Sequence, residues 1–204
     1  ELYALAVIIA DQKETPADNL GEFFMEMNFT EDSKGQFFTP YNVCECMASI
    51  TINDNVQTLE KQEWISVNDP ACGAGATLVA AANIFHRKKI NYQTRVLFTA
   101  NDIDRVVAQM CYIQLSLLGC AGWVAVANTI SNPVCGDPLM PVEKPGQEFW
   151  YTPFYFREEW NCRRQVQIFK EMCGSWITPI EERNPGKITF YFDFEKGDYK
   201  CQNS

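Results

Sequence analysis

A glycine-bearing turn is the first feature of this sequence that could do chemistry. The run DPACGAGA, residues 69–76, lies where a short apolar segment gives way to a helical pattern. Glycines at a strand-to-helix turn let the backbone approach a ligand without a Cβ in the way, which suits a nucleotide-like cofactor. Such turns also serve as tight packing turns, and Gly73 and Gly75 alone favour neither interpretation. The run is not a phosphate-binding P-loop, and it lacks the full dinucleotide pattern of three spaced glycines.

An acidic group follows the next apolar segment. Asp102 stands just after the segment Val96 to Ala100, where a carboxylate can accept hydrogen bonds from both hydroxyls of a ribose. We therefore predict that Asp102 binds a ribose, with the alternative that it only caps a helix. Asp104 is predicted to be the N-cap of the helix that begins at Arg105.

The surrounding pattern predicts the elements that position these groups. Short apolar runs that end in turn residues and lead into longer helical patterns are typical of β-α units with a parallel sheet. Phe149 to Phe156 is a further candidate strand, and Ile188 to Phe194 is predicted to be a late strand from its aromatic and β-branched content. The three predicted strands are about Trp64 to Val67, Val96 to Ala100 and Trp123 to Ala127, and their helices are Ala76 to Phe85 and Val106 to Leu118.

The N-terminal part has helical spacing. We predict a helical extension over residues 1–60 and an α/β domain over residues 61–204, with helices on both faces of a mostly parallel sheet. Pro40 can start the second helix of the extension near its first turn. The predicted apolar faces of the two helices are Leu20, Phe23, Phe24 and Met27 in the first, and Val43, Met47 and Ile50 in the second.

Composition narrows the classes of function. The 204 residues carry a formal charge of −9, which argues against an unaided non-specific DNA binder because Lys and Arg supply most of that affinity. Nine cysteines without a CxxC pair, together with the single histidine His86, predict a reducing cytosol and no metal site. The apolar start, Leu2 to Ala10, is too short to span a bilayer, so no membrane segment is expected.

Three motifs, in order, resemble the N6-adenine DNA methyltransferase family of the type found in modification subunits of type I restriction systems. Residues 69–76 resemble its cofactor motif, Asn101 to Asp104 (NDID) its acidic motif, and Gly35 to Pro40 (GQFFTP) an element that precedes the sheet. Leu20 to Phe24 is similar to the helix upstream of that element. The resemblance implies a Rossmann-like S-adenosylmethionine-dependent methyltransferase fold, with Phe38, Thr39 and Pro40 at the methionine end of the cofactor, Asp69, Cys72, Gly73 and Gly75 around its amino acid moiety, and Asp102 on the ribose.

The family's third element, which reaches the adenine of the cofactor, has two candidates here. Asn128 directly follows the third predicted strand and is favoured by its position. Asp137 has the better chemistry but lies further on, and its simplest interpretation is a turn residue before Pro138.

The fourth element departs from the family's pattern. In relatives, a polar residue, two prolines and an aromatic residue bind the amino group of a flipped adenine and stack on its ring. The matching run in this chain, Tyr151 to Phe154, has one proline and aromatic residues but no amide or carboxylate side chain. The alternative interpretation of the range Phe149 to Phe156 is a buried aromatic strand. Asn132-Pro133 has no aromatic residue after it and is predicted to be a loop. The candidate base-facing catalytic residues are Tyr151, Thr152, Pro153 and Phe154.

The resemblance implies methyl transfer from S-adenosylmethionine to the N6 amino group of adenine in DNA. The altered fourth element, the acidic charge and the short stretch after Trp160 support an alternative, a catalytically silent cofactor-binding or assembly module. Methylation of a small molecule or a protein also stays open. The expected partners are DNA, bound weakly by the chain alone, and a specificity or restriction subunit, in the cytoplasm.

Overall fold

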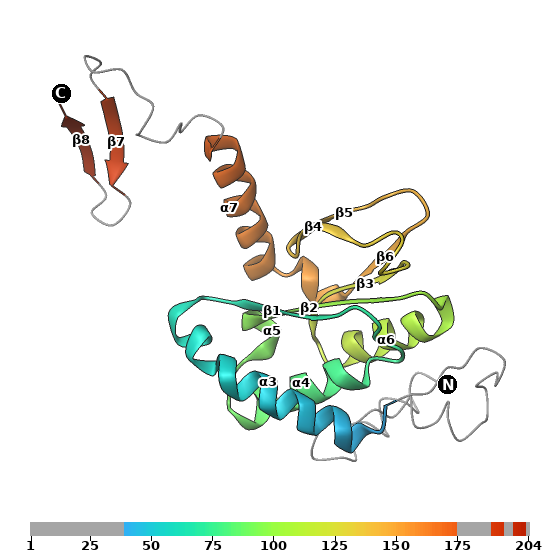
Figure 1. Ribbon diagram of the computed structural model, residues 1–204. Coiled ribbons are helices and arrows are strands. Elements are labelled where there is room, and N and C mark those ends of the chain that lie inside the picture. The colour runs from blue at the N-terminus through green and yellow to red at the C-terminus, as the bar shows by residue number, and fades with distance from the viewer. Residues whose placement is uncertain (1–38, 175–188, 194–197, 203–204) are drawn as a thin grey trace. The chain divides into compact units, whose positions relative to one another are not determined.

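The computed structural model describes residues 39–174, 189–193 and 198–202 (Figure 1). The predicted helix around Leu20 and the predicted cofactor contact Phe38 lie outside the described residues. Two compact units divide the chain, residues 1–164 and residues 165–204. The predicted boundary between residues 60 and 61 is a different division and stays a prediction.

The first unit is built on a four-stranded sheet with the order β1-β2-β3-β6. β1 (Ile65–Asp69), β2 (Val96–Asp102) and β3 (Ala121–Val126) are parallel, which confirms the three predicted strands and gives a mixed α/β fold. β6 (Glu148–Tyr151) is antiparallel to β3. We call the end of the sheet where β1, β2 and β3 finish the carboxyl end, and the opposite one the amino end. The other elements are α3 Tyr41–Lys61, α4 Ala76–Arg87, α5 Tyr92–Arg95, α6 Arg105–Leu117, β4 Cys135–Asp137, β5 Met140–Val142, the 3₁₀ helix η2 Pro153–Phe156 and α7 Glu158–Gly174.

The two faces of the sheet are covered differently (Figure 1). Phe98 and Val124 contribute to the core that α3, α4 and α6 cover, whereas Leu97 and Trp123 contribute to the core on the other face, as the two-residue period of a strand requires. The β4–β5 hairpin, η2 and the start of α7 cover this second face. Among the residues that the structure describes, no helix combines the length and apolar character needed to cross a membrane.

Small residues, rather than the large apolar ones, join α3 to α4. Cys44 is fully buried and clusters with Ala76 and Ala80 of α4. Because the side chains at a helix contact set the distance between the axes, small residues let the two helices approach closely. The helix is confirmed but its predicted buried face is wrong, since Val43, Met47 and Ile50 are 44%, 53% and 61% exposed.

The fourth predicted strand is shorter than expected. β6 ends at Tyr151, and η2 occupies the rest of the predicted range, residues 149–156. Pro153 lacks the N–H that a strand would donate, and it stands at the start of η2. The predicted late strand is confirmed in the second unit as β7 (Thr189–Asp193), which forms an antiparallel hairpin with β8 (Asp198–Gln202).

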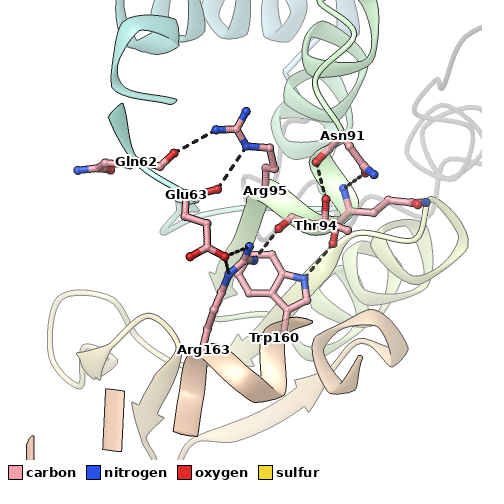
Figure 2. A network of polar contacts seen from close by, with 8 residues as sticks. Gln62, Glu63, Asn91, Thr94, Arg95, Trp160 and Arg163 are labelled. Atoms are coloured by element: carbon pink, nitrogen blue, oxygen red, sulfur yellow. Dashed lines mark hydrogen bonds and ion pairs between the residues drawn. The ribbon is translucent and has the colours of Figure 1, made fainter. Parts of the chain in front are cut away.

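The start of α7 is fixed to the amino end of the sheet (Figure 2). Arg163 forms an ion pair with Glu63 (Nη2 to Oε1, 2.9 Å) and donates a hydrogen bond to the Thr94 carbonyl oxygen (2.5 Å). The Trp160 indole N–H donates to the Gln93 carbonyl oxygen (2.9 Å), and the Arg163 guanidinium lies 4.4 Å from the centre of the Trp160 ring. Three segments that are distant in sequence therefore meet here. We call the pair Trp160 and Arg163 the α7 lock.

Candidate functional site

The glycine turn, residues 69–76, follows β1 at the carboxyl end of the sheet. Gly73 and Gly75 have φ angles of 51° and 96°, in the left-handed region that glycine adopts at low cost. A Cβ at Gly75 would lie 2.8 Å from the Cys111 Sγ atom of α6. Gly75 is therefore a packing glycine at the start of α4, whereas Gly73 is only half-buried.

Side chains from two other elements hold this turn. The Asp102 carboxylate accepts a hydrogen bond from the Gly73 N–H (Oδ2, 2.8 Å), and the Gln114 side-chain amide donates to the Ala74 carbonyl oxygen (2.8 Å). Gln114 is buried in α6, and the sequence analysis did not single it out. The predicted helix contains two glutamines, Gln109 and Gln114, and residue type alone does not tell which of them is buried. The turn is thus fixed in shape before any ligand binds.

Asp102 has a structural role beside its predicted ligand role. Its Oδ1 atom accepts a hydrogen bond from the Asp104 N–H (2.9 Å), while Oδ2 is engaged with the turn. A carboxylate offers about four acceptor positions, so unused ones are left for ribose hydroxyls. The Asp104 side chain accepts from the Val106 N–H (2.8 Å), which confirms the predicted N-cap of α6.

Asp69 and Cys72 direct their side chains into the turn and the core. Asp69 accepts hydrogen bonds from the Ala71 N–H (Oδ1, 3.1 Å) and from the Thr77 hydroxyl. Cys72 is 6% exposed, and a hydrogen bond with Cys111 followed by burial raises the pKa of its thiol, so the sulfur stays neutral. Both side chains therefore maintain the turn, and their predicted contacts with a cofactor stay predictions.

Thr39 and Pro40 are exposed residues just before α3. The Pro40 carbonyl oxygen accepts hydrogen bonds from the Val43 N–H (2.9 Å) and the Cys44 N–H (3.2 Å), which confirms that Pro40 starts this helix. Cys44 packs against Ala76, the first residue of α4. The structure therefore brings the end of the GQFFTP element to the helix that follows the glycine turn.

Of the two candidates for an adenine contact, Asn128 lies at the carboxyl end of the sheet. It follows β3, and its Oδ1 atom accepts hydrogen bonds from the N–H groups of Ile130 and Ser131 (2.9 Å each). Asp137 ends β4 and accepts from the Leu139 N–H (2.8 Å), which confirms it as a turn residue. The position of Asn128 fits its predicted role, but the contact stays a prediction.

Asn132 and Pro133 follow Asn128 in the same connection. The Asn132 N–H donates to the Asn128 carbonyl oxygen (2.9 Å), and its side-chain amide donates to the Pro145 carbonyl oxygen (3.2 Å). Neither residue belongs to a helix or a strand, so the prediction of a loop is confirmed.

The predicted base-facing residues lie at the other end of the sheet. β6 runs antiparallel to β3, with Tyr151 beside Trp123 and Glu148 beside Val126. The chain therefore leaves β6 at the amino end, where β3 begins. The strand that leads into this loop runs opposite to β1, β2 and β3, so the loop does not lie with the predicted cofactor contacts, and its base-facing role stays a prediction. The displaced residues are Tyr151, Thr152, Pro153 and Phe154.

Thr152 is also sealed from any substrate. It is fully buried, and its hydroxyl donates to the Cys120 carbonyl oxygen (2.7 Å) and accepts from the Gly122 N–H (3.0 Å). Tyr151 packs on Tyr155 with ring centres 4.8 Å apart, and burial raises the pKa of the Tyr151 phenol. The alternative interpretation, a buried aromatic strand, holds only in part, because the strand ends at Tyr151 and Phe156 is 57% exposed.

A cavity of about 410 Å³ lies along β1. Its lining includes Ile52, Ile65, Val67 and Phe85. No residue that we predicted to bind the cofactor lines it.

Comparison with protein families identifies the family to which this chain belongs. The model of the N-6 DNA methylase family matches residues 17–160, more than half of the chain. The chain belongs to the N-6 DNA methylase family. The match contains the GQFFTP element, the glycine turn, Asp102 and Asn128, so the resemblance seen in the sequence is confirmed. No curated protein and no solved structure matches the chain.

Membership of the N-6 DNA methylase family supports DNA methyl transfer as the general class of activity. The matched range ends at Trp160, within the first turn of α7. It therefore includes the run Tyr151 to Phe154, in which Thr152 is fully buried and Pro153 is exposed.

Proposed function

We propose that this chain binds S-adenosylmethionine at the carboxyl end of the sheet, as the cofactor-binding part of an N6-adenine DNA methyltransferase with a Rossmann-like fold. The observation that carries the proposal is the hydrogen bond from the Gly73 N–H to the Asp102 carboxylate (2.8 Å). This bond joins the two predicted halves of the pocket, the glycine turn and the ribose ligand. The family match and the parallel strands support the same conclusion.

The residues present fit this cofactor. Asp102 is half-buried and has acceptor positions to spare for two ribose hydroxyls. Gly73 leaves the turn open to a backbone approach, and Asn128, in the segment after β3, offers a side-chain amide for the adenine. Thr39 and Pro40 would lie toward the methionine end. When bound, S-adenosylmethionine supplies an electrophilic methyl group, and the chain's part is to hold and orient it.

Calorimetry with S-adenosylmethionine tests cofactor binding directly. We expect saturable binding of one molecule per chain. An unmutated, folded chain that takes up no cofactor at millimolar concentration would overturn the proposal.

A second candidate function, a catalytically silent cofactor-binding module, is favoured by the burial of Thr152. Methyl transfer to adenine needs a polar group and an aromatic ring at the base. In the run that resembles that element, the polar side chain of Thr152 is buried, so this chain would depend on another segment or on a partner subunit to bind the base.

Transfer of radiolabelled methyl groups to unmethylated genomic DNA separates the two candidates. The assay would compare the chain alone with the chain plus a specificity or restriction subunit. Label in the N6 position of adenine supports the first candidate. Cofactor binding without label under every condition supports the silent module.

DNA binding by the chain alone should be weak. With a charge of −9, few phosphates can be neutralised, and we expect dissociation constants on the order of 10⁻⁴ M or weaker at physiological salt. Gel-shift titrations check this. Nanomolar, sequence-selective binding by the isolated chain would contradict a need for a partner that holds the DNA.

A further inference from the structure

A hydroxyl and an amide connect the glycine turn to the segment after β3. The Thr129 hydroxyl donates a hydrogen bond to the Pro70 carbonyl oxygen (2.5 Å) and accepts one from the Asn101 side-chain amide (2.6 Å). Proline has no N–H, so this carbonyl is the only backbone hydrogen-bonding group of residue 70. In the sequence, Asn101 is only the first residue of the acidic motif NDID, and Thr129 belongs to no motif.

Asn101 completes a ring of contacts around the turn. Its carbonyl oxygen accepts from the Cys72 N–H (3.0 Å), and its side-chain amide also donates to the Ala127 carbonyl oxygen (3.3 Å). Asn101 is 5% exposed, whereas Thr129 lies on the surface. The chain of contacts therefore runs from Cys72 through Asn101 and Thr129 to Pro70.

We propose that Asn101 and Thr129 are a pair of positioning residues that set the glycine turn against the segment carrying Asn128. The proposal rests on the proposed function, because the two connected segments are the predicted contacts for the amino acid moiety and for the adenine of one cofactor. The pair itself touches no reacting atom. It acts through the placement of the Pro70 and Cys72 backbone.

The chemistry of the pair explains why these residue types are needed. Only a group that donates and accepts at once can bind the Pro70 carbonyl oxygen and the Asn101 amide together. Serine and threonine hydroxyls do this, whereas valine has nearly the same shape and does neither. The substitution Thr129→Val therefore removes both contacts without changing the volume of an exposed side chain.

The test is S-adenosylmethionine affinity, measured by calorimetry on the full chain. We expect Thr129→Val to weaken binding by about three- to tenfold, the effect of losing one or two hydrogen bonds, and Thr129→Ser to restore it to within about twofold. The matched control is Thr51→Val on α3, an exposed threonine whose hydroxyl also donates to a carbonyl oxygen, that of Met47 (2.9 Å). Equal affinities for the unmutated chain and Thr129→Val would overturn the proposal.

A double-variant cycle separates positioning from general stability. If Asn101 and Thr129 act as one unit, Asn101→Ala with Thr129→Val should lose about as much affinity as Asn101→Ala alone. Independent residues would instead give losses that multiply, which would contradict the pair. Thr129→Val and Thr129→Ser are surface substitutions and carry the test even if Asn101→Ala does not fold.

Amide hydrogen exchange in the ligand-free chain tests the positioning pair independently of cofactor binding. In the ligand-free chain, the Cys72 and Gly73 amides should exchange faster in Thr129→Val than in Thr129→Ser. Faster exchange with no cofactor binding by the unmutated chain would refute the proposed function and leave the positioning pair standing. Unchanged exchange at both amides would refute the pair.

Discussion

The glycine turn and the turn after β6 each follow a strand and lead into a helix, yet their residues differ in burial and in the end of the sheet at which they lie. In the glycine turn, groups from β2 and α6 hold the backbone while Gly73 stays half-buried. In the turn after β6, Thr152 is fully buried and its hydroxyl bonds only to backbone groups around β3. The difference shows that resemblance to a motif does not fix where a run of residues lies, because the direction of the preceding strand decides which end of the sheet the run reaches.

The largest expected effect comes from breaking the glycine turn itself. Gly75→Ala would force a left-handed φ of 96° on alanine and place its Cβ 2.8 Å from the Cys111 Sγ atom. Strain and overpacking together should lower the free energy of unfolding by about 2 to 4 kcal/mol. Urea unfolding measures this. Adding Cys111→Ala should recover the part due to the clash, and no recovery would mean that backbone strain alone is responsible.

Removing the Asp102 carboxylate, the predicted ribose-binding group, should weaken cofactor binding more selectively than any other substitution. Asp102→Ala deletes the predicted acceptor for two hydroxyls, so affinity for S-adenosylmethionine should fall by roughly ten- to a hundredfold, or about 1 to 3 kcal/mol. The matched control is Asp104→Ala, which removes the α6 N-cap (2.8 Å to the Val106 N–H) and should cost stability of about 1 kcal/mol with little loss of affinity. Similar affinity losses in both variants would argue against a special role for Asp102.

At the other turn, the expected effect is on stability alone. Thr152→Val leaves the Gly122 N–H and the Cys120 carbonyl oxygen without the Thr152 hydroxyl in a fully buried position, which should lower the free energy of unfolding by about 1 to 3 kcal/mol. Cofactor affinity should not change. Thermal unfolding and calorimetry check the two halves of this prediction, with Thr152→Ser as the control that keeps the hydroxyl. A large loss of cofactor affinity at constant stability would show that this turn contributes to cofactor binding after all.

The smallest effect concerns pH at the amino end of the sheet. Burial raises the pKa of Tyr92, whose hydroxyl donates to the Leu118 carbonyl oxygen (2.9 Å), to about 12. Because the unfolded pKa of tyrosine is about 10, the folded chain keeps the proton that the unfolded chain loses. The stabilisation is complete below about pH 10 and is lost as pH rises toward 12. Stability curves for Tyr92→Phe should fall less steeply in this window, and identical slopes would contradict the assignment.

Short sequence patterns were enough to predict much of the fold. The three parallel strands, the Asp104 cap and the helix start at Pro40 follow from short patterns, and each is present in the structure. The buried face of α3 could not be predicted the same way. It depends on the fit of Cys44 against α4, and the larger apolar side chains of the helix are exposed instead.

The site was predictable only in part, for a related reason. The glycine turn and Asp102 are marked by residue type next to a strand end. The supports of the turn are not, because Thr129 and Gln114 act on residues 59 and 40 positions away in the sequence. The place of Thr152 depends on the direction in which β6 pairs with β3, and the composition of a strand does not encode that direction.

The α7 lock bears on how this chain is completed during synthesis. Trp160 and Arg163 lie among the last residues of the first unit, and Arg163 contacts Glu63 and Thr94, which leave the ribosome long before it. Domains assemble as their chain emerges, from the N-terminus onward. A nascent chain that ends before α7 therefore contains all the strands of the sheet but lacks the α7 lock. The contacts at the amino end of the sheet form only after the first turns of α7 have been synthesised.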